Sequence, residues 1–153
     1  MTDDLEALED WAGALLAKLE PGERRRLNQS IARKLRKSQQ QRITAQRNPD
    51  GTPFAPRKER DLRAKKGRVK RKMFTTLKTA KYLKLQADAN TIGLAFMGRT
   101  ARLARVHQYG LRDRPGLNSP RVKYEERKLL GFTADERDMI RDELLAHLAA
   151  RDL

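Results

Sequence analysis

The sequence contains no cysteine among its 153 residues. A chain without cysteine forms neither a disulfide framework nor a thiolate metal site, so we expect a protein of a reducing compartment or of a particle assembled in one. No apolar run approaches the roughly 20 residues that a membrane-spanning helix needs. The first four residues, Met1 to Asp4, are acidic where a secretory signal is basic, so we expect neither a signal peptide nor a membrane partner.

Catalytic motifs are lacking as well. The chain has only two histidines, His107 and His147, and no nucleophile elbow, phosphate-binding loop, zinc-protease motif or dinucleotide fingerprint. Asp135, Asp138 and Asp142 follow one another at helical spacing, which charge pairs within a helix explain better than a metal site does. We therefore predict that the protein is not an enzyme and has no catalytic residue, no cofactor and no bound metal.

Aromatic residues make up only 5% of the chain. So small a share disfavours recognition of single-stranded nucleic acid by base stacking. The sequence also has no zinc finger, no RNA-recognition signature and no convincing helix-turn-helix. If the protein touches DNA, we expect contacts to the phosphate backbone without reading of the base sequence.

Positive charge is abundant. Lysine and arginine number 35 against 20 acidic residues, which gives a net charge of +15, so an acidic partner is expected. The charge is unevenly placed: residues 1–20 carry −5, residues 21–72 carry +15, residues 73–128 carry +8 and residues 129–153 carry −3. Two acidic ends thus flank a basic middle, an arrangement that favours head-to-tail contacts between copies. An ordinary solvated surface is the alternative interpretation.

Hydrophobic spacing predicts two helices at the N-terminus. Apolar residues at intervals of three and four give one stripe over residues 3–19, with Asp3 as a cap. Leu27, Ile31 and Leu35 recur every four residues in a second, strongly basic helix over residues 21–46. We expect these helices to form a hairpin over residues 1–46.

A basic loop is predicted next, over residues 47–72. It opens with the turn sequence Asn48-Pro49-Asp50-Gly51. From Arg57 onward it has almost no large apolar residue and so cannot bury itself. We expect this stretch to be mobile or ordered by a partner.

The remainder, residues 73–153, is predicted to be an α+β core. The expected elements are a short helix over 73–80, a β-hairpin over 82–97 turning at Asp88-Ala89-Asn90, a helix over 99–109 capped by Gly110, a loop over 112–120, a short strand over 122–124, and a last helix opened by the capping box of Thr133 and Glu136. The predicted fold is α+β in a single domain over residues 1–153, with an N-terminal helical pair, a small antiparallel β-hairpin packed by helices, and a C-terminal helix.

Three stretches together resemble a known family. They are the string from Gln46 to Lys58 (QRNPDGTPFAPRK), the string from Ala104 to Arg114 (ARVHQYGLRDR), and Leu129 to Phe132 followed by an acidic helix. This pattern is similar to the virion morphogenesis, or tail-completion, proteins of contractile-tailed temperate phages. The resemblance covers nearly the whole chain. It departs from the family pattern at Tyr124-Glu125, where a proline is expected after the tyrosine.

The resemblance implies a structural, non-enzymatic virion protein that is assembled in the host cytoplasm and located in the tail or neck. Such proteins act at the head-proximal end of the tail and make it competent to join the filled head. Related neck and tail-end proteins form rings around the DNA channel, often six-fold. The expected partners are therefore further copies of the chain in a ring, with six as the expected number, other neck and tail proteins such as the tail tube, terminator or connector, and the DNA backbone in the channel if DNA is touched at all.

We assign the candidate contacts to basic residues and to residues near the end of the predicted helix over 99–109. The candidates for a partner interface are Arg57, Lys58, Arg99, Arg102, Arg105, His107, Tyr109, Arg112 and Arg114. The candidates in the basic loop, for a partner or the DNA backbone, are Arg63, Lys65, Lys66, Arg68, Lys70, Arg71 and Lys72.

Two other functions stay open at this stage. The first is a basic DNA-binding architectural or regulatory protein with no place in the virion, which steep salt dependence of tight DNA binding would support. The second is a nuclease or muramidase, whose activity would depend on Asp50, His107 or Glu125.

Overall fold

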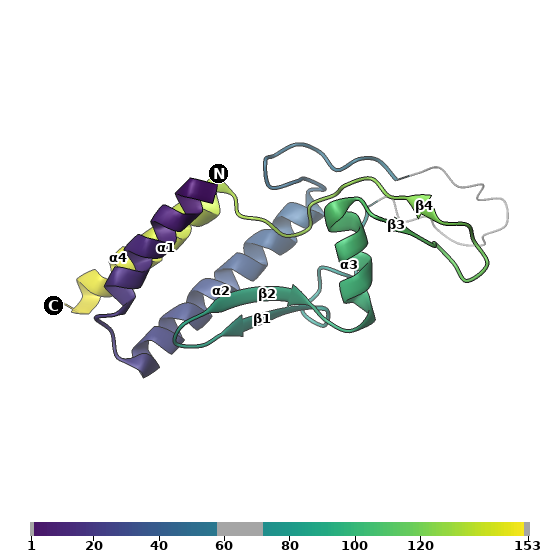
Figure 1. The fold of residues 1–153 in the computed structure, drawn as a ribbon. Coiled ribbons are helices and arrows are strands. Elements are labelled where there is room, and N and C mark those ends of the chain that lie inside the picture. The colour runs from purple at the N-terminus through teal and green to yellow at the C-terminus, as the bar shows by residue number, and fades with distance from the viewer. Residues whose placement is uncertain (1, 58–71, 152–153) are drawn as a thin grey trace. The chain divides into compact units, whose positions relative to one another are not determined.

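The computed structural model describes residues 2–57 and 72–151 (Figure 1). Its elements are, in chain order, α1 (Thr2–Leu16), α2 (Pro21–Thr44), β1 (Leu83–Ala87), β2 (Ile92–Phe96), α3 (Arg99–Tyr109), β3 (Arg112–Asp113), β4 (Val122–Lys123) and α4 (Ala134–Arg151). The strands form two sheets of two strands each, β1 with β2 and β3 with β4. The predicted α+β class is confirmed, with helices at both ends of the described chain.

The chain divides into two compact units. The first consists of residues 1–38, 84–95 and 132–153, and the second of residues 39–83 and 96–131. Both are assembled from segments far apart in the sequence. The prediction of a single domain stays a prediction.

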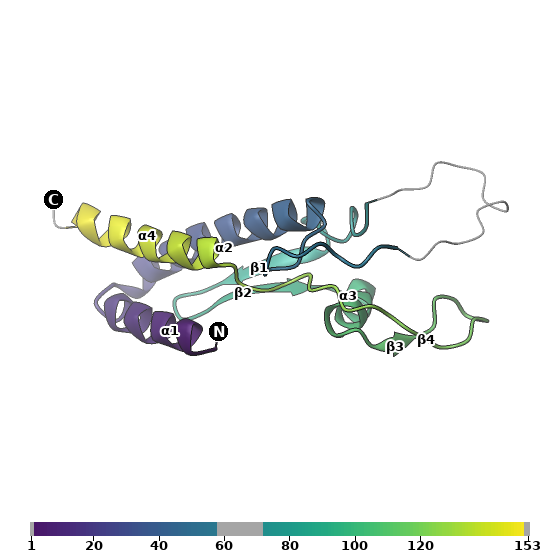
Figure 2. The ribbon, with the colours of Figure 1, turned by 90° about the horizontal axis from the view of Figure 1, so that it is seen from above.

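Helices and the β1–β2 hairpin build the core of the first unit. Its most deeply buried large side chain is Ile31, which belongs to the predicted stripe with Leu27 and Leu35 on α2. Leu144 of α4 joins this stripe, and apolar residues of α1 and β2 pack against it. Figures 1 and 2 show α1 and α4 running alongside each other, and the two helices are in contact. The narrow apolar stripes predicted from spacing are therefore the core-facing sides of the helices.

The predicted capping box opens α4. The Glu136 carboxylate accepts a hydrogen bond from the Thr133 backbone N–H at 3.0 Å, and the Glu136 backbone N–H donates to the Thr133 hydroxyl at 3.1 Å. The Ser38 hydroxyl also donates to Glu136 at 2.7 Å, so this carboxylate is 2% exposed yet well bonded. Two otherwise unpaired donors of the first turn are satisfied, which fixes where the helix begins.

The predicted hairpin is present as β1 and β2, which run in opposite directions (Figure 1). Between the strands the Asp88 carboxylate accepts from the backbone N–H groups of Asn90 and Thr91, both at 2.7 Å. An aspartate that bonds the backbone two and three residues ahead is a common turn former. These bonds are also the main reason that the pKa of Asp88 is lowered. The reversal includes Thr91, one residue more than the three predicted.

The core of the second unit gathers Ile43, Phe54, Leu77, Ala104 and Leu129. Phe54 and the ring of Phe74 meet edge to face, with centroids 5.8 Å apart. Phe54 is 5% exposed, so the first part of the predicted basic loop is anchored in this core. Residues 58–71 of that loop lie outside the described residues.

The predicted short helix over residues 73–80 is wrong. The segment is a series of turns, with one bond of helical type from Lys78 N–H to the Phe74 carbonyl at 3.1 Å. Phe74 itself has φ +66, a left-handed conformation from which no right-handed helix can begin. The apolar spacing there serves a turn whose side chains pack into the core.

The helix α3 ends as predicted, but the chain after it differs. Gly110 adopts φ 62 and ψ 48, and its backbone N–H donates to the Val106 carbonyl. The stretch predicted as a loop over 112–120 begins with a strand, β3, which pairs with β4 in antiparallel register. Two-residue strands carry no period-two pattern, so the sequence offered no signal for β3. Among the helices that the structure describes, none is both long and apolar enough to cross a membrane.

Candidate interaction surface

The sequence strings that carry the family resemblance meet in the second unit, beginning at the end of α2. Gln46 has φ 58, and its N–H donates to the Ile43 carbonyl at 2.9 Å while the Arg47 N–H donates to the Arg42 carbonyl at 3.3 Å. This pair of bonds is the Schellman helix end, with glutamine where glycine is usual. The Gln46 amide also exchanges two hydrogen bonds with the backbone of Met73, which offset the strain of its left-handed conformation.

The next residues form a closed turn. The Asn48 N–H donates to the Thr52 carbonyl at 2.8 Å, and the Phe54 N–H donates to the Gln46 carbonyl at 2.7 Å. Asp50 accepts from the Thr52 hydroxyl and backbone N–H, and these bonds lower its pKa. The carboxylate of Asp50 is therefore engaged as a turn former, the role that its Asn-Pro-Asp-Gly context favours.

Arg127 is the centre of the second group of contacts. Its guanidinium is buried, with the whole residue 5% exposed, and donates to the carbonyls of Ala55 at 2.8 Å and Pro56 at 2.9 Å. It also lies 3.3 Å from Nδ1 of His107, and the Arg127 backbone N–H donates to the His107 carbonyl at 2.7 Å. One side chain thus ties the string after the turn to the string on α3.

His107 is buried within this group. Its ring lies edge to face with Phe74 at 4.8 Å and with Tyr124 at 5.2 Å between centroids. Burial, and secondly the positive charge of Arg127, lower the pKa of His107 to about 4. The imidazole is therefore neutral at physiological pH, and its Nδ1 can accept a hydrogen bond from Arg127.

The third string has no regular secondary structure and is held by side chains. Arg42 donates to the carbonyls of Lys128 at 3.0 Å and Leu129 at 2.6 Å, and Gln39 donates to the Gly131 carbonyl at 2.7 Å. The remaining bonds come from Gln108, which both donates to and accepts from the backbone of Leu130, and from Asn48, which accepts from the Lys128 N–H. Buried backbone groups need such partners, so long polar side chains take the place of a neighbouring strand.

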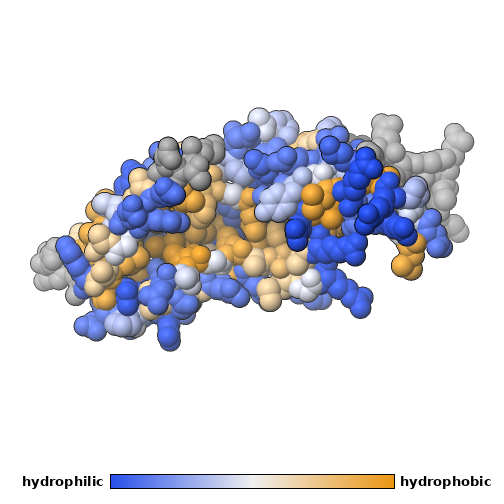
Figure 3. All heavy atoms as spheres, in the orientation of Figure 1, coloured by the Kyte–Doolittle hydropathy of each residue, from blue (hydrophilic) through white to orange (hydrophobic). Residues whose placement is uncertain are grey.

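The basic candidates of α3 lie on the surface. Arg99, Arg102 and Arg105 are all exposed, and in Figure 3 strongly hydrophilic side chains cluster over α3 and β3. Arg102 forms an ion pair with Asp113 at 2.7 Å, which links α3 to β3. The Arg114 backbone N–H and then Arg102 lower the pKa of Asp113, so this carboxylate stays charged.

The β3–β4 arms continue this basic surface. Arg112 lies directly opposite Lys123 in the register, and both side chains are exposed. Like charges directly opposite each other destabilise a strand pair. Arg114 directly follows β3 and Arg121 directly precedes β4, and both are exposed. The arms therefore carry several exposed cations, with the Asp113 carboxylate among them.

The predicted site residues other than the arginines of α3 and the β3 arm divide into three groups. His107 is buried and presents no side chain to a partner, whereas Tyr109 is 65% exposed at the end of α3. Arg57 and Lys72 are both exposed, and they are the last described residue before and the first after residues 58–71. The other candidates, Lys58, Arg63, Lys65, Lys66, Arg68, Lys70 and Arg71, lie outside the described residues.

Sequence reasoning missed the side chains that hold the second unit together. Arg127 stands in the charged run Glu125-Glu126-Arg127-Lys128, where nothing local separates it from its exposed neighbours. Arg42 and Gln39 lie in a polar tract of α2 that reads as solvated helix. For Leu117 the sequence does carry a signal of exposure, because it is an isolated apolar residue in a loop that contains proline and glycine. In the structure Leu117 is 97% exposed.

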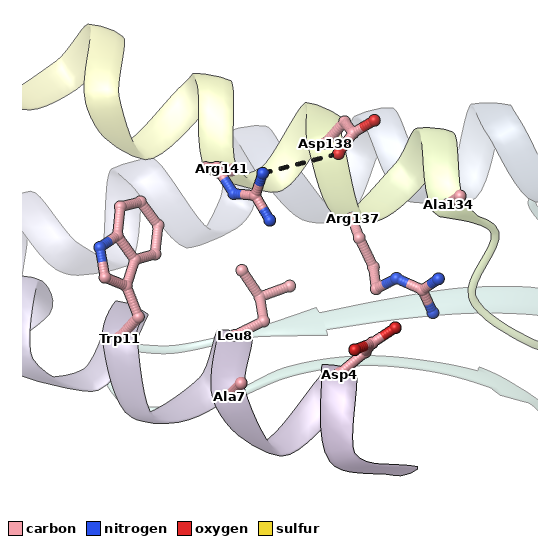
Figure 4. Close-up of a pocket in the computed structure, with 8 residues that line it drawn as sticks. All are labelled: Asp4, Ala7, Leu8, Trp11, Ala134, Arg137, Asp138 and Arg141. Carbon is pink, nitrogen blue, oxygen red and sulfur yellow. Dashed lines mark ion pairs between the residues drawn. The ribbon is translucent and has the colours of Figure 1, made fainter. Parts of the chain in front are cut away.

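The first unit has a groove between α1 and α4 (Figure 4). Its volume is about 530 Å³, and Leu8 and Trp11 of α1 line it together with charged residues of α4. In Figure 4 Arg137 and Asp4 extend toward the same end of the groove, and Arg141 pairs with Asp138 at 3.8 Å. No group of three acidic or histidine side chains able to hold a metal ion occurs in the described part of the chain.

Comparison with known proteins agrees with the family resemblance that the three strings carry. The chain is 42% identical, over 147 residues, to a protein of Escherichia phage P2 named tail completion protein S, with 95% of this chain and 98% of that protein covered. No solved structure matches the chain. The sequence profile of the phage virion morphogenesis family matches residues 3–149. The chain therefore belongs to the phage virion morphogenesis family, whose members are structural proteins and not enzymes.

Proposed function

We propose that this protein completes the phage tail at its head-proximal end, as a ring of copies, and makes the tail competent to join the filled head. The observation that carries the proposal is the 42% identity to a tail completion protein over nearly the full length of both chains. The matching region includes both units, so the likeness is not confined to one motif.

The charge distribution supports a surface for acidic partners. By residue count, the second unit holds twenty-three bases against six acids, whereas the first holds twelve against fourteen. The net positive charge of the chain thus comes from the second unit. We assign the contact with neck or tail proteins to its exposed arginines, Arg57 and the group on α3 and β3, with the DNA backbone as a further possible anion.

Charge reversal tests this assignment. In a phage that lacks its own copy of the gene, we expect Arg112→Glu with Arg114→Glu to lower the phage yield by an order of magnitude or more, with filled heads and unjoined tails visible by electron microscopy. Both side chains are exposed, so the purified variant should keep its thermal unfolding midpoint. The matched control is Arg26→Glu with Arg33→Glu, two exposed arginines of α2 in the first unit. Normal yield with the first variant would refute the assignment.

DNA binding over a salt series tests the rival function. Each phosphate contact steepens the fall of affinity with salt by about 0.9 on a double-logarithmic plot. We expect weak, sequence-independent binding that is lost near physiological salt. Tight binding at that salt by a protein whose absence leaves head–tail joining intact would favour a DNA-binding role instead.

A further inference from the structure

The β3–β4 hairpin of the second unit is an unusual projection. Figures 1 and 2 show its arms extending beyond α3, and the turn between them includes a bond from the Ser119 N–H to the Gly116 carbonyl. At this turn lies Leu117, the most exposed large apolar residue of the described chain. The Leu117 side chain is thus almost fully accessible to a partner, and the arms beside it place Arg112 opposite Lys123.

The α1–α4 groove has complementary chemistry. Apolar side chains of Ala7, Leu8, Trp11 and Ala134 line it, enough to receive one aliphatic side chain within about 530 Å³. In Figure 3 apolar atoms gather beside α1. The groove is therefore a partly apolar site that a leucine side chain can enter.

Acidic residues lie on the α1 side of the groove. Asp4 lines it, and Asp10 follows the lining residue Ala7 by three residues, so these two side chains neighbour each other on α1. The Asp10 carboxylate is exposed, as is Asp4 at the end of the groove. Acidic residues on the α1 side thus stand where the basic arms of a docked hairpin would lie, whereas Arg137 and Arg141 occupy the α4 side.

We propose that the β3–β4 hairpin of one copy docks on the α1–α4 groove of a second copy, with Leu117 against Ala7 and Trp11 and the hairpin arginines facing the acids of α1. Each copy carries both surfaces, so the contact is head to tail and can repeat around a ring. This inference rests on the self-association in the proposed function and names the surfaces that make it. Duplex DNA would neutralise the arginines but would give Leu117 no apolar partner, so the second copy is the better match.

Cysteine cross-linking tests the contact, because the chain has no cysteine of its own. Two single variants of the full chain, Leu117→Cys and Ala7→Cys, are mixed, with a size tag on one, and oxidised. A disulfide requires Cα atoms roughly 4.4–6.8 Å apart, so only a docked hairpin should bond efficiently. We expect the mixed dimer to exceed both same-variant dimers several-fold. In the control, Ala7→Cys is replaced by Ala146→Cys, an exposed position on α4 that does not line the groove.

Charge exchange makes the test more specific. Arg114→Glu on the Leu117→Cys chain, or Asp10→Arg on the Ala7→Cys chain, should each reduce the mixed dimer several-fold. The two changes together should restore much of it, since the attraction is then reversed and not lost. Recovery would support the assigned orientation, and equal loss in the double combination would overturn it.

Light scattering of the unmodified protein separates the remaining outcomes. If the protein forms oligomers but Leu117→Cys bonds no more to Ala7→Cys than to Ala146→Cys, the docking contact is wrong and the proposed ring stands. If the protein is monomeric at every concentration, both the contact and the ring in solution are overturned. If short duplex DNA is retained by wild type and lost by Leu117→Asp with no mixed dimer formed, the hairpin is a DNA contact and the inference fails.

Discussion

Removing the buried guanidinium of Arg127 is the sharpest test of how the segment after the turn is held against α3 in the second unit. The change is Arg127→Met, which keeps an unbranched apolar stem and deletes the guanidinium. The lost interactions are the two bonds to the carbonyls of Ala55 and Pro56 and the contact with His107. Hydrogen bonds from a charged group contribute about 1.5–3 kcal/mol each.

The net cost is smaller than the sum of those bonds. Burying a guanidinium carries a desolvation penalty, which methionine removes, and burial is also the main reason that the pKa of Arg127 is lowered. Pro56 is exposed, so water can donate to its carbonyl in place of the lost guanidinium. We therefore expect the free energy of unfolding to fall by about 2–3 kcal/mol. For a chain of this size that lowers the melting temperature by about 4–12 °C.

Urea denaturation and thermal unfolding measure this loss, and a surface arginine supplies the control. Arg105→Met removes the same group from an exposed position on α3 and should change stability by less than about 0.5 kcal/mol. Arg127→Lys should be intermediate, because an ammonium cannot reproduce the fork that reaches two carbonyls. If Arg127→Met is as stable as the control, the guanidinium does not hold the turn segment to α3 and the reasoning is refuted.

Three further predictions follow from single contacts. Gly131→Ala should destabilise the protein by about 1–3 kcal/mol in urea denaturation, because an added Cβ would lie 2.6 Å from Cγ of Pro49; a neutral result would mean that the two segments separate easily. Thr133→Ala should cost about 1 kcal/mol by the same assay, since it removes the hydroxyl that accepts from Glu136, and Thr133→Ser should recover most of it. His107 stays neutral in the folded chain down to about pH 4 but is protonated below about pH 6.5 when unfolded, so stability should fall as the pH falls through this window, and His107→Asn should flatten that part of the profile.

The parts of the fold that sequence predicts are those fixed by neighbours in the chain. The stripe of Leu27, Ile31 and Leu35 predicts a helix because its residues lie on one face whatever packs there. Gly110 and the Thr133–Glu136 box predict helix ends because their bonds close within four residues. Such signals need no knowledge of tertiary structure.

The parts that sequence does not predict are fixed across long separations. Arg127 bonds Ala55 over 72 residues, and only the folded unit distinguishes it from Lys128 beside it. The turn at Phe74 has helical spacing because its apolar side chains meet Phe54 and His107, not because the backbone is helical. Periodicity reports which side chains are buried, and it identifies the element only when the backbone is regular.

The strings that carry the family resemblance thus contain two kinds of residue, buried ones and exposed ones. Gln46, Phe54 and His107 are inside the second unit or bonded to its backbone, whereas Arg112 and Arg114 are exposed. Changes to the two sets should fail in different ways. Arg127→Met should lower phage yield in proportion to the folded protein that remains, and a lower growth temperature should rescue it, because the defect is one of stability. Arg112→Glu with Arg114→Glu should lower yield at every temperature while folded protein persists, because the defect is one of contact. If lower temperature rescued both variants equally, Arg112 and Arg114 would stabilise the fold and would not form a surface for partners.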